Sequence, residues 1–250
     1  MTISKQWQVS WKRVGIGLLI AFAVLWLAGQ VIESMEPWIE ARRMQQENPA
    51  IAAVPARLSD SRLAKLTGDE IQFFGVSMQT PWTWTQTVHS TLTPGMAMSA
   101  FPDHHLVIAL SEPNMGDDFE DKMLRNISGK QGPEVKLTRL DLMAAEMATT
   151  PTDLKWWRSR IRNEAASFLL EMKALKLGRA KVIYRIDGGN LRGFQEGDPQ
   201  IAPYSVHLDI FDASDRHYQV GFEPAPGSRP DITQAQINSM AASLRYAPQN

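Results

Sequence analysis

The sequence predicts an α+β fold, in which a single N-terminal transmembrane helix is followed by a mostly antiparallel sheet covered by helices. The stretch from Val14 to Ile32 contains no charged residue, which is typical of a membrane-spanning helix. After residue 70, short segments rich in β-branched and aromatic residues alternate with Pro- and Gly-containing turns, as antiparallel strands do. Segments with apolar residues at every third or fourth position lie among and after these strands, which indicates packed helices.

The apolar stretch is long enough to cross a bilayer as a helix. At about 1.5 Å of rise per residue, about 20 residues span a hydrocarbon core of about 30 Å. A cleaved signal peptide would have a shorter apolar core and a small residue three positions before the cleavage site, where Trp26 stands if cleavage follows Ala28. We therefore expect a retained anchor in contact with the lipid bilayer from Val14 to Ile32; a cleaved signal and a buried soluble helix are the alternatives.

The charges that flank this stretch predict its orientation. Lys5, Lys12 and Arg13 precede it, whereas Glu33 and further acidic residues follow it, and Arg42 is farther away. Because Lys and Arg close to a span favour the cytoplasmic side, we expect a cytoplasmic N-terminus. The C-terminal domain would then be periplasmic or extracellular, and the cell inner membrane of a bacterium is the expected setting.

Changes in composition predict four regions along the chain: a cytoplasmic tail at 1–13, a transmembrane helix at 14–33, a helical stalk and linker at 34–69, and an extracytoplasmic α+β domain at 70–250. Pro49 and Pro55 disfavour helix in the residues that precede them. The linker is therefore expected to be a tether that contains one short helix at 61–66.

The domain is predicted to begin with strands. The segment 71–82 has the composition of one strand and ends in a Pro-Trp pair. The segments 96–101 and 104–113 are predicted as two further strands, which pair through a turn at Pro102 and Asp103.

Three helices are predicted in the middle of the chain. Two are short, at 117–128 and 138–147. The third is long, because Thr150 can cap it, Pro151 suits its first position and Gly178 can end it. Its buried face is predicted from the apolar residues that recur every three or four positions, which are Leu154, Trp157, Ile161, Ala165, Phe168, Met172 and Leu175.

After Gly178 the pattern changes to alternation, which predicts a meander of strands. A strand at 181–187 enters a hairpin turn at 187–190, and strands at 204–212 and 217–224 are joined by a short loop. A closing helix follows, capped by Asp231 or Thr233. Its packed side is predicted to consist of Ile237, Met240, Ala241 and Leu244.

The opening strand with its Pro-Trp end (GVSMQTPWTW) and the last helix with its Ser-Leu end (INSMAASLRY) resemble the Mog1/PsbP-like α/β/α sandwich domains. The resemblance covers the residues from Ile71 to Pro81 and from Tyr204 to Tyr246. It implies a sandwich fold and a role as a binding or assembly module, which most such domains have. It implies no catalytic residue, because the family pattern offers none to match.

The composition excludes several classes of function. The chain has no cysteine, which excludes disulfides, thiol nucleophiles and Cys-based zinc sites. A net charge of −1 gives no basic excess for nucleic acid, so we expect no nucleic-acid partner. The sequence contains no Walker, G-x-G-x-x-G or G-x-S-x-G motif, so we expect no nucleotide cofactor and no recognisable catalytic residue.

Histidine and carboxylate residues offer one candidate metal site. His207 and His217 are cross-strand neighbours if a turn lies between them, and Asp209 and Asp212 are close in sequence. We favour the simpler interpretation, two exposed histidines on strands, and predict no metal and no cofactor. The acidic residues at 117–121 are likewise interpreted as a helix N-terminus and not as a calcium site.

Aromatic residues offer the best candidate contact with a ligand or partner. On a strand, Trp82 and Trp84 point the same way, and they form either part of the core or an exposed platform. If they are exposed, Arg192 and Phe194 of the predicted hairpin are expected to lie at the edge of the same site, together with Gln195.

These observations predict a non-catalytic, membrane-anchored binding or assembly module of the cell envelope, whose partner is another envelope or membrane protein. The first alternative is a membrane-anchored hydrolase with a site that motifs do not reveal. The second is an accessory subunit whose anchor packs on another membrane protein. An exposed apolar patch would favour the module, and a polar pocket that contains a carboxylate with a shifted pKa would favour the enzyme.

Overall fold

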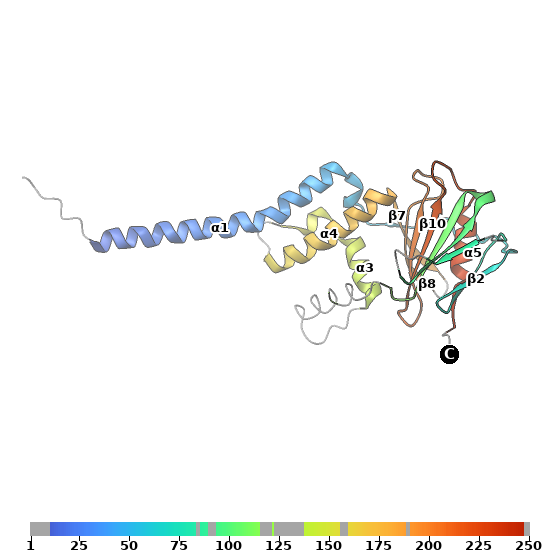
Figure 1. Ribbon diagram of the computed structural model, residues 1–250. Coiled ribbons are helices and arrows are strands. Elements are labelled where there is room, and N and C mark those ends of the chain that lie inside the picture. Colours follow the sequence, from blue (N-terminus) through green and yellow to red (C-terminus); the bar gives the residue numbers. More distant parts are fainter. Residues whose placement is uncertain are drawn as a thin grey trace, which may run out of the picture.

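The computed structural model combines a long N-terminal helix with an α+β body (Figure 1). The body contains a mixed sheet of eight strands and a second sheet of three strands. The predicted α+β class is therefore confirmed. The structure describes residues 11–83, 86–89, 94–115, 122, 138–155, 160–188 and 191–247.

The large sheet contains one parallel pair, and its other pairs are antiparallel. β1 pairs in parallel with β7 at the edge of the sheet. The strands follow in the spatial order β1 (Ala56–Arg57), β7 (Ile183–Gly188), β8 (Leu191–Glu196), β9 (Val206–Phe211), β10 (His217–Pro224), β6 (Leu106–Ser111), β5 (Met96–Phe101) and β4 (Gln86–His89). The small sheet consists of β11 (Arg245–Tyr246), β3 (Val76–Gln79) and β2 (Glu70–Phe73). The predicted hairpins β5–β6, β7–β8 and β9–β10 are confirmed.

The helices are α1 (Trp11–Glu47), α3 (Arg139–Ala148), α4 (Arg160–Ala180) and α5 (Gln234–Ser243). Two of them begin with a capping box: α3 at Thr138, where the predicted helix starts, and α5 at Thr233, one of the two caps predicted for it. Thr138 accepts a hydrogen bond from the backbone N–H of Asp141 at α3, and Thr233 accepts one from that of Gln236 at α5. In return, the side chains of Asp141 and Gln236 accept hydrogen bonds from the backbone N–H groups of these two threonines. Each capping box therefore satisfies two backbone donors that would otherwise be unpaired.

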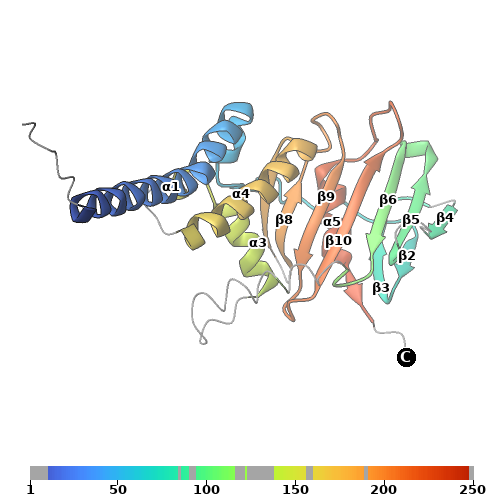
Figure 2. The same ribbon diagram turned by 60° about the vertical axis from the view of Figure 1, so that its left-hand side comes forward.

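Helix α1 runs without interruption from the apolar stretch into the body. It is the one helix in the described part of the chain that is long and apolar enough to cross a membrane, and no residue from Leu18 to Ile32 is buried. Its C-terminal part packs against α4, where Ala41 is buried and Met44 is half-buried. Pro37 lies between the two parts, and the helix bends between them (Figures 1 and 2).

Two hydrophobic cores lie on opposite faces of the large sheet. Strand β9 shows the division, because Leu208 belongs to the first core and Phe211 belongs to the second. The first core includes residues of α5 and the β2–β3 hairpin, and the second includes residues of α3, α4 and the C-terminal part of α1. In Figure 2, α5 lies behind the sheet, and α3 and α4 lie beside its β8 end.

The segment predicted as a single opening strand is a hairpin. β2 and β3 are joined by Phe74 and Gly75, which both have positive φ, 54° and 74°. A Cβ atom at Gly75 would lie 2.7 Å from the carbonyl oxygen of Ala247, so this position requires glycine. The prediction was wrong because Phe74 continues an apolar run and gives no turn signal.

The segment before β2 is docked on α5. The backbone N–H of Ala64 donates to the carbonyl of Ala235 at 3.2 Å and to the Oγ of Ser239 at 2.7 Å. The same hydroxyl donates to the carbonyl of Ala64 at 2.9 Å. The short helix expected at 61–66 does not form. These residues have no regular secondary structure, and the backbone of Ala64 hydrogen-bonds to α5.

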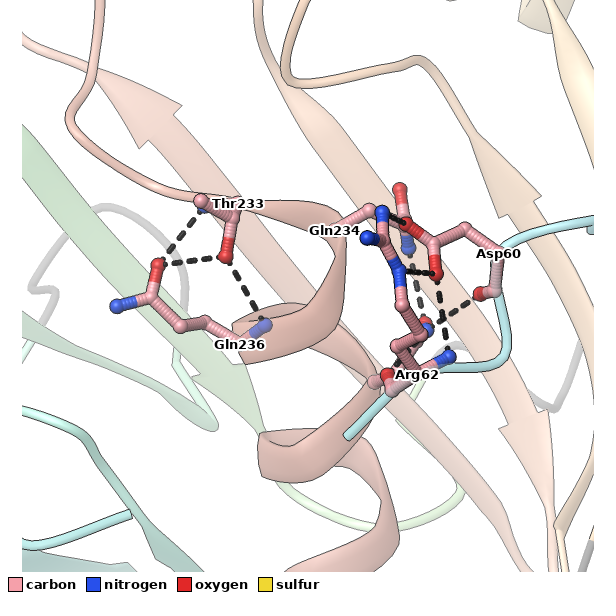
Figure 3. Close-up of polar contacts among 6 residues, drawn as sticks. Asp60, Arg62, Thr233, Gln234 and Gln236 are labelled. Atoms are coloured by element: carbon pink, nitrogen blue, oxygen red, sulfur yellow. Dashed lines mark hydrogen bonds and ion pairs between the residues drawn. The ribbon is translucent and has the colours of Figure 1, made fainter. Parts of the chain in front are cut away.

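Further polar contacts hold the start of this segment (Figure 3). Asn238 of α5 donates from Nδ2 to the carbonyls of Asp60, at 2.6 Å, and Arg62, at 3.1 Å. Gln234, also on α5, donates to Oδ1 of Asn238 at 3.0 Å and exchanges amide hydrogen bonds with Gln195 of β8 at 2.8 and 2.9 Å. Helix α5 therefore connects the segment to the large sheet.

Helix α4 begins and ends later than predicted. The capping box of Thr150 and Asp153 closes a 3-10 turn, η3 (Pro151–Asp153), after which Leu154 and Lys155 are not helical, and the described part of the helix runs from Arg160. Gly178 lies inside the helix, and the first residue with positive φ after it is Lys181, at 68°. A lysine therefore occupies the left-handed position at which glycine is more common.

The buried face of α4 also differs from the predicted stripe. Leu175 is 66% exposed, whereas Lys173 is only 1% exposed and is buried with Leu170 and Leu177. Leu154, before the helix, is buried as predicted. The remaining described members of the stripe are half-buried, namely Ala165, Phe168 and Met172. Trp157, the side chain of Ile161 and the helix predicted at 117–128 lie outside the described residues.

Candidate functional site

A groove lies between α3, α4 and the face of the large sheet that carries the second core. Its volume is about 210 Å³. Its apolar lining residues are Leu142, Met143, Phe168, Leu169 and Met172. Its polar lining residues are Arg139, Glu146, Lys176, Arg179, Glu196, Asp209 and Gln219. The lining therefore combines apolar and charged side chains, and both helices contribute each kind.

Helical and strand periodicity bring these residues together. On α4, Phe168, Met172 and Lys176 are spaced by four residues, so they lie on one face of the helix. On the sheet, Asp209 of β9 is directly opposite Gln219 of β10, so both side chains project from the same face. The groove therefore has α3 and α4 as its walls and β8, β9 and β10 as its floor.

One ammonium group lies between two buried carboxylates. The Nζ atom of Lys176 is 3.4 Å from Oε1 of Glu146 on α3 and 3.5 Å from Oε1 of Glu196 on β8. Arg179 approaches Glu196 from the solvent side, with 3.0 Å between Nη2 and Oε2, and its side chain is 65% exposed. These ion pairs connect α4 to α3 and to the sheet.

A second polar pair, Asp209 and His217, lies deeper. Nε2 of His217 is 3.0 Å from Oδ1 of Asp209, and the His217 ring stacks on Phe211 at 4.5 Å between centroids. Gln219 donates to the same Oδ1 at 3.4 Å. Burial alone would raise the pKa of Asp209, but the hydrogen bond from His217 and the charge of Lys176 lower it to about 2. Asp209 is therefore an anion at neutral pH.

Glu146 behaves differently from Asp209. Burial raises the pKa of Glu146 to about 7, although the charge of Lys176 opposes this shift. Burial also raises the pKa of Glu196, against the opposing charges of Lys176 and Arg179. Glu146 is therefore a carboxylate that exchanges a proton near neutral pH.

The stability of the protein is expected to decrease as the pH rises through about 7. The folded state holds the proton of Glu146 more tightly than the unfolded chain, whose pKa is near 4.5. The resulting stabilisation is complete below pH 4.5 and is lost above about pH 7, and it amounts to about 3 kcal/mol. Denaturant melts of the full chain in detergent at pH 5 and 8.5 measure the difference.

Glu146→Gln should remove most of this pH dependence, because glutamine mimics the protonated acid. The matched control is Glu171→Gln, since Glu171 is an exposed residue of the same helix as Lys176. Equal pH slopes in the wild type and in Glu146→Gln would contradict the assignment.

The structure places the aromatic candidates in two different regions. Trp82 is half-buried on the first core, where it stacks on His104 at 4.4 Å and contacts Phe101 at 5.5 Å between ring centroids. Phe194 is buried in the second core, on the opposite face of the sheet. Arg192 is exposed, and Trp84 lies outside the described residues.

The structure therefore does not bring Trp82 and Phe194 together. A ligand contact at Trp82, Trp84 or Arg192 stays a prediction. Phe194, by contrast, packs with the apolar residues of α3 and α4, which makes it a core residue.

The two strand histidines are not neighbours. His207 is directly opposite Gly221, and its Nε2 lies 2.9 Å from Oε1 of Glu223. His217 pairs with Asp209 instead and is fully buried, so it is not the exposed histidine that we expected. No group of three or more His, Asp or Glu side chains that could hold a metal occurs within the described ranges.

The sequence did not reveal the charged residues of the groove. The one available signal was Glu146, which interrupts the buried face of α3 formed by Leu142, Met143 and Met147. A carboxylate at such a position needs a buried partner, but Lys176 is 30 residues away in sequence.

Comparison with known protein families, with characterised proteins and with solved structures finds no match to this chain.

Proposed function

We propose that the protein is a membrane-anchored, extracytoplasmic binding or assembly module of the cell envelope. The observation that carries this proposal is the continuity of α1, which has an exposed apolar part and a C-terminal part with Ala41 buried in the second core. The anchor is retained in this proposal, because removal of α1 by a signal peptidase would separate the body from residues of its own core. Another envelope or membrane protein is the proposed partner.

The resemblance to Mog1/PsbP-like domains supports the same role. Such domains mostly bind or assemble with other molecules, and the α+β class found here is compatible with theirs. The groove between α3, α4 and the sheet is the proposed binding site, since convergent polar groups among apolar side chains are typical of ligand sites.

Orientation can be tested with a single cysteine, because the chain has none. Ser59 is exposed, so Ser59→Cys should react with a membrane-impermeant maleimide in intact spheroplasts. Ser4→Cys, on the other side of the apolar stretch, should react only after lysis. Labelling of Ser59→Cys only after lysis would refute the proposed orientation.

One observation favours the alternative of a membrane-anchored hydrolase. The pKa of Glu146 is near 7 and the residue lines a groove, which is the environment of many general acids and bases. Hydrolysis of chromogenic esters or glycosides by the purified chain, and its loss in Glu146→Gln, would support the hydrolase. The absence of hydrolysis across such a panel would leave the binding role as the better proposal.

A further inference from the structure

Two buried groups of the groove lack a close hydrogen-bond partner. Glu146 is 7% exposed, and its Oε1 accepts no hydrogen bond from the described residues. Lys176 reaches its carboxylates only at 3.4 to 3.5 Å, whereas a charge-assisted hydrogen bond is usually about 2.7–2.9 Å long. The carboxylate needs a donor and the ammonium needs an acceptor, and both line the same groove.

The charges of the groove are balanced. Its described lining contains three cations, Arg139, Lys176 and Arg179, and three carboxylates, Glu146, Glu196 and Asp209. Lys176, Glu146, Glu196 and Asp209 are largely shielded from solvent. A ligand with a net charge would place a like charge against one of them, which is costly at low dielectric. The groove therefore suits a neutral ligand.

Hydroxyl groups meet both requirements at once. A hydroxyl donates one hydrogen, which Oε1 of Glu146 can accept, and it accepts through two lone pairs, which the ammonium of Lys176 can use. The amide of Gln219 on the floor adds both a donor and an acceptor. Several polar groups arranged in this way suit a molecule with several hydroxyls.

The apolar lining residues and the volume of the groove limit the size and shape of the ligand. Phe168 and Met172 of α4 offer a surface for the C–H groups of a ring. The volume of about 210 Å³ is below the range of about 300–1,000 Å³ that drug-sized ligands occupy. One saturated ring with its hydroxyl groups is the appropriate size.

We propose that this groove binds a neutral, polyhydroxylated ring compound, such as one sugar unit or an inositol. The ring lies against Phe168 and Met172, and its hydroxyls bridge Glu146 and Lys176. This inference deepens the proposed binding function by naming the chemical class of its ligand. It is independent of the side of the membrane on which the body lies, so cysteine labelling and ligand binding can fail separately.

The test uses the full chain in phospholipid nanodiscs, because glycoside detergents would compete for the groove. Saturation-transfer NMR is recorded with D-glucose, N-acetyl-D-glucosamine and myo-inositol as probes. Butyrate and n-butylammonium serve as charged, hydroxyl-free controls. We expect transfer to at least one hydroxylated probe and weaker or no transfer to the two controls. Transfer to none of the three hydroxylated probes, or stronger binding of a charged control, would overturn the proposal.

The position of the bound probe is tested by methyl NMR spectra of the wild-type protein labelled at its methionine methyl groups. The signals of Met143 and Met172, which line the groove, should shift with the bound probe, and that of Met78 in the first core should not. Conservative Met→Leu variants assign each signal. A probe that binds without shifting Met143 or Met172 would place its site elsewhere and overturn the inference.

Substitutions provide an independent measurement. Glu146→Leu removes the acceptor, and Phe168→Ala removes the apolar surface. Each is expected to weaken probe binding at least about tenfold, or about 1.4 kcal/mol, whereas Glu171→Gln should bind like the wild type. Wild-type affinity in both folded variants would contradict the proposal, and if either variant fails to fold, the methyl shifts of the wild type decide.

Discussion

Lys173→Ala is expected to lower the free energy of unfolding by about 2–5 kcal/mol, because it leaves backbone acceptors without a donor and removes a buried aliphatic chain. The Nζ atom of Lys173 donates to the carbonyls of Ala53 at 2.8 Å, Met147 at 3.0 Å and Thr149 at 2.9 Å. All three hydrogens of the ammonium group are thereby used. Burial lowers the pKa of Lys173 to about 8, so the group is still mostly charged at pH 7.

The matched control for this change is Leu175→Ala, two residues farther along α4. Leu175 is exposed, so its truncation should change the stability by no more than about 0.5 kcal/mol. Denaturant melts of both variants in detergent give the comparison. A larger loss in Leu175→Ala than in Lys173→Ala would mean that the buried face of α4 is wrongly assigned.

Removal of the residues before Ser61 is expected to abolish cooperative unfolding of the body. The truncation deletes Ala41 and Ile51 from the second core, β1 from the edge of the sheet and the carbonyl of Ala53 that Lys173 contacts. Loss of a buried Ile side chain alone costs about 2–5 kcal/mol, and a typical domain has only about 5–15 kcal/mol of stability.

A chain that begins at Ser34 is the control, because it lacks the apolar stretch but keeps every one of these contacts. It should give a sharp thermal transition, whereas the chain that begins at Ser61 should aggregate or melt without one. Equal transitions in the two chains would show that the 34–60 region is a detachable stalk, as the sequence suggested.

The parts of the fold that depend on local sequence were predictable. The alternation in β9 and β10 identified both strands, and the cap at Thr233 located the start of α5. The docking of residues 58–69 was not predictable, because it depends on hydrogen bonds such as that from Asn238 to Asp60, which are 178 residues apart. Local patterns carry no information about partners at such a distance.

The candidate site was less predictable than the fold. Apolar periodicity treats Lys173 and Lys176 as solvent-facing, yet both are held by groups from other elements. The same periodicity assigned Phe168 to the centre of a buried stripe, but it lines the groove and is half-buried. A buried charge is compatible with folding only when its partners converge on it, and that convergence is a property of the tertiary structure.

The proline in α1 has a consequence for neighbouring copies of the protein. Pro37 cannot donate a backbone hydrogen bond and its ring crowds the preceding turn, so it produces an elbow in a long helix. If the apolar part stands upright in a bilayer, the bend gives the C-terminal part of α1, and the body packed against it, one direction about the axis of the membrane helix. Two copies could then bring their membrane helices together only if their bodies pointed in different directions, so Pro37 would determine which pairings the membrane permits.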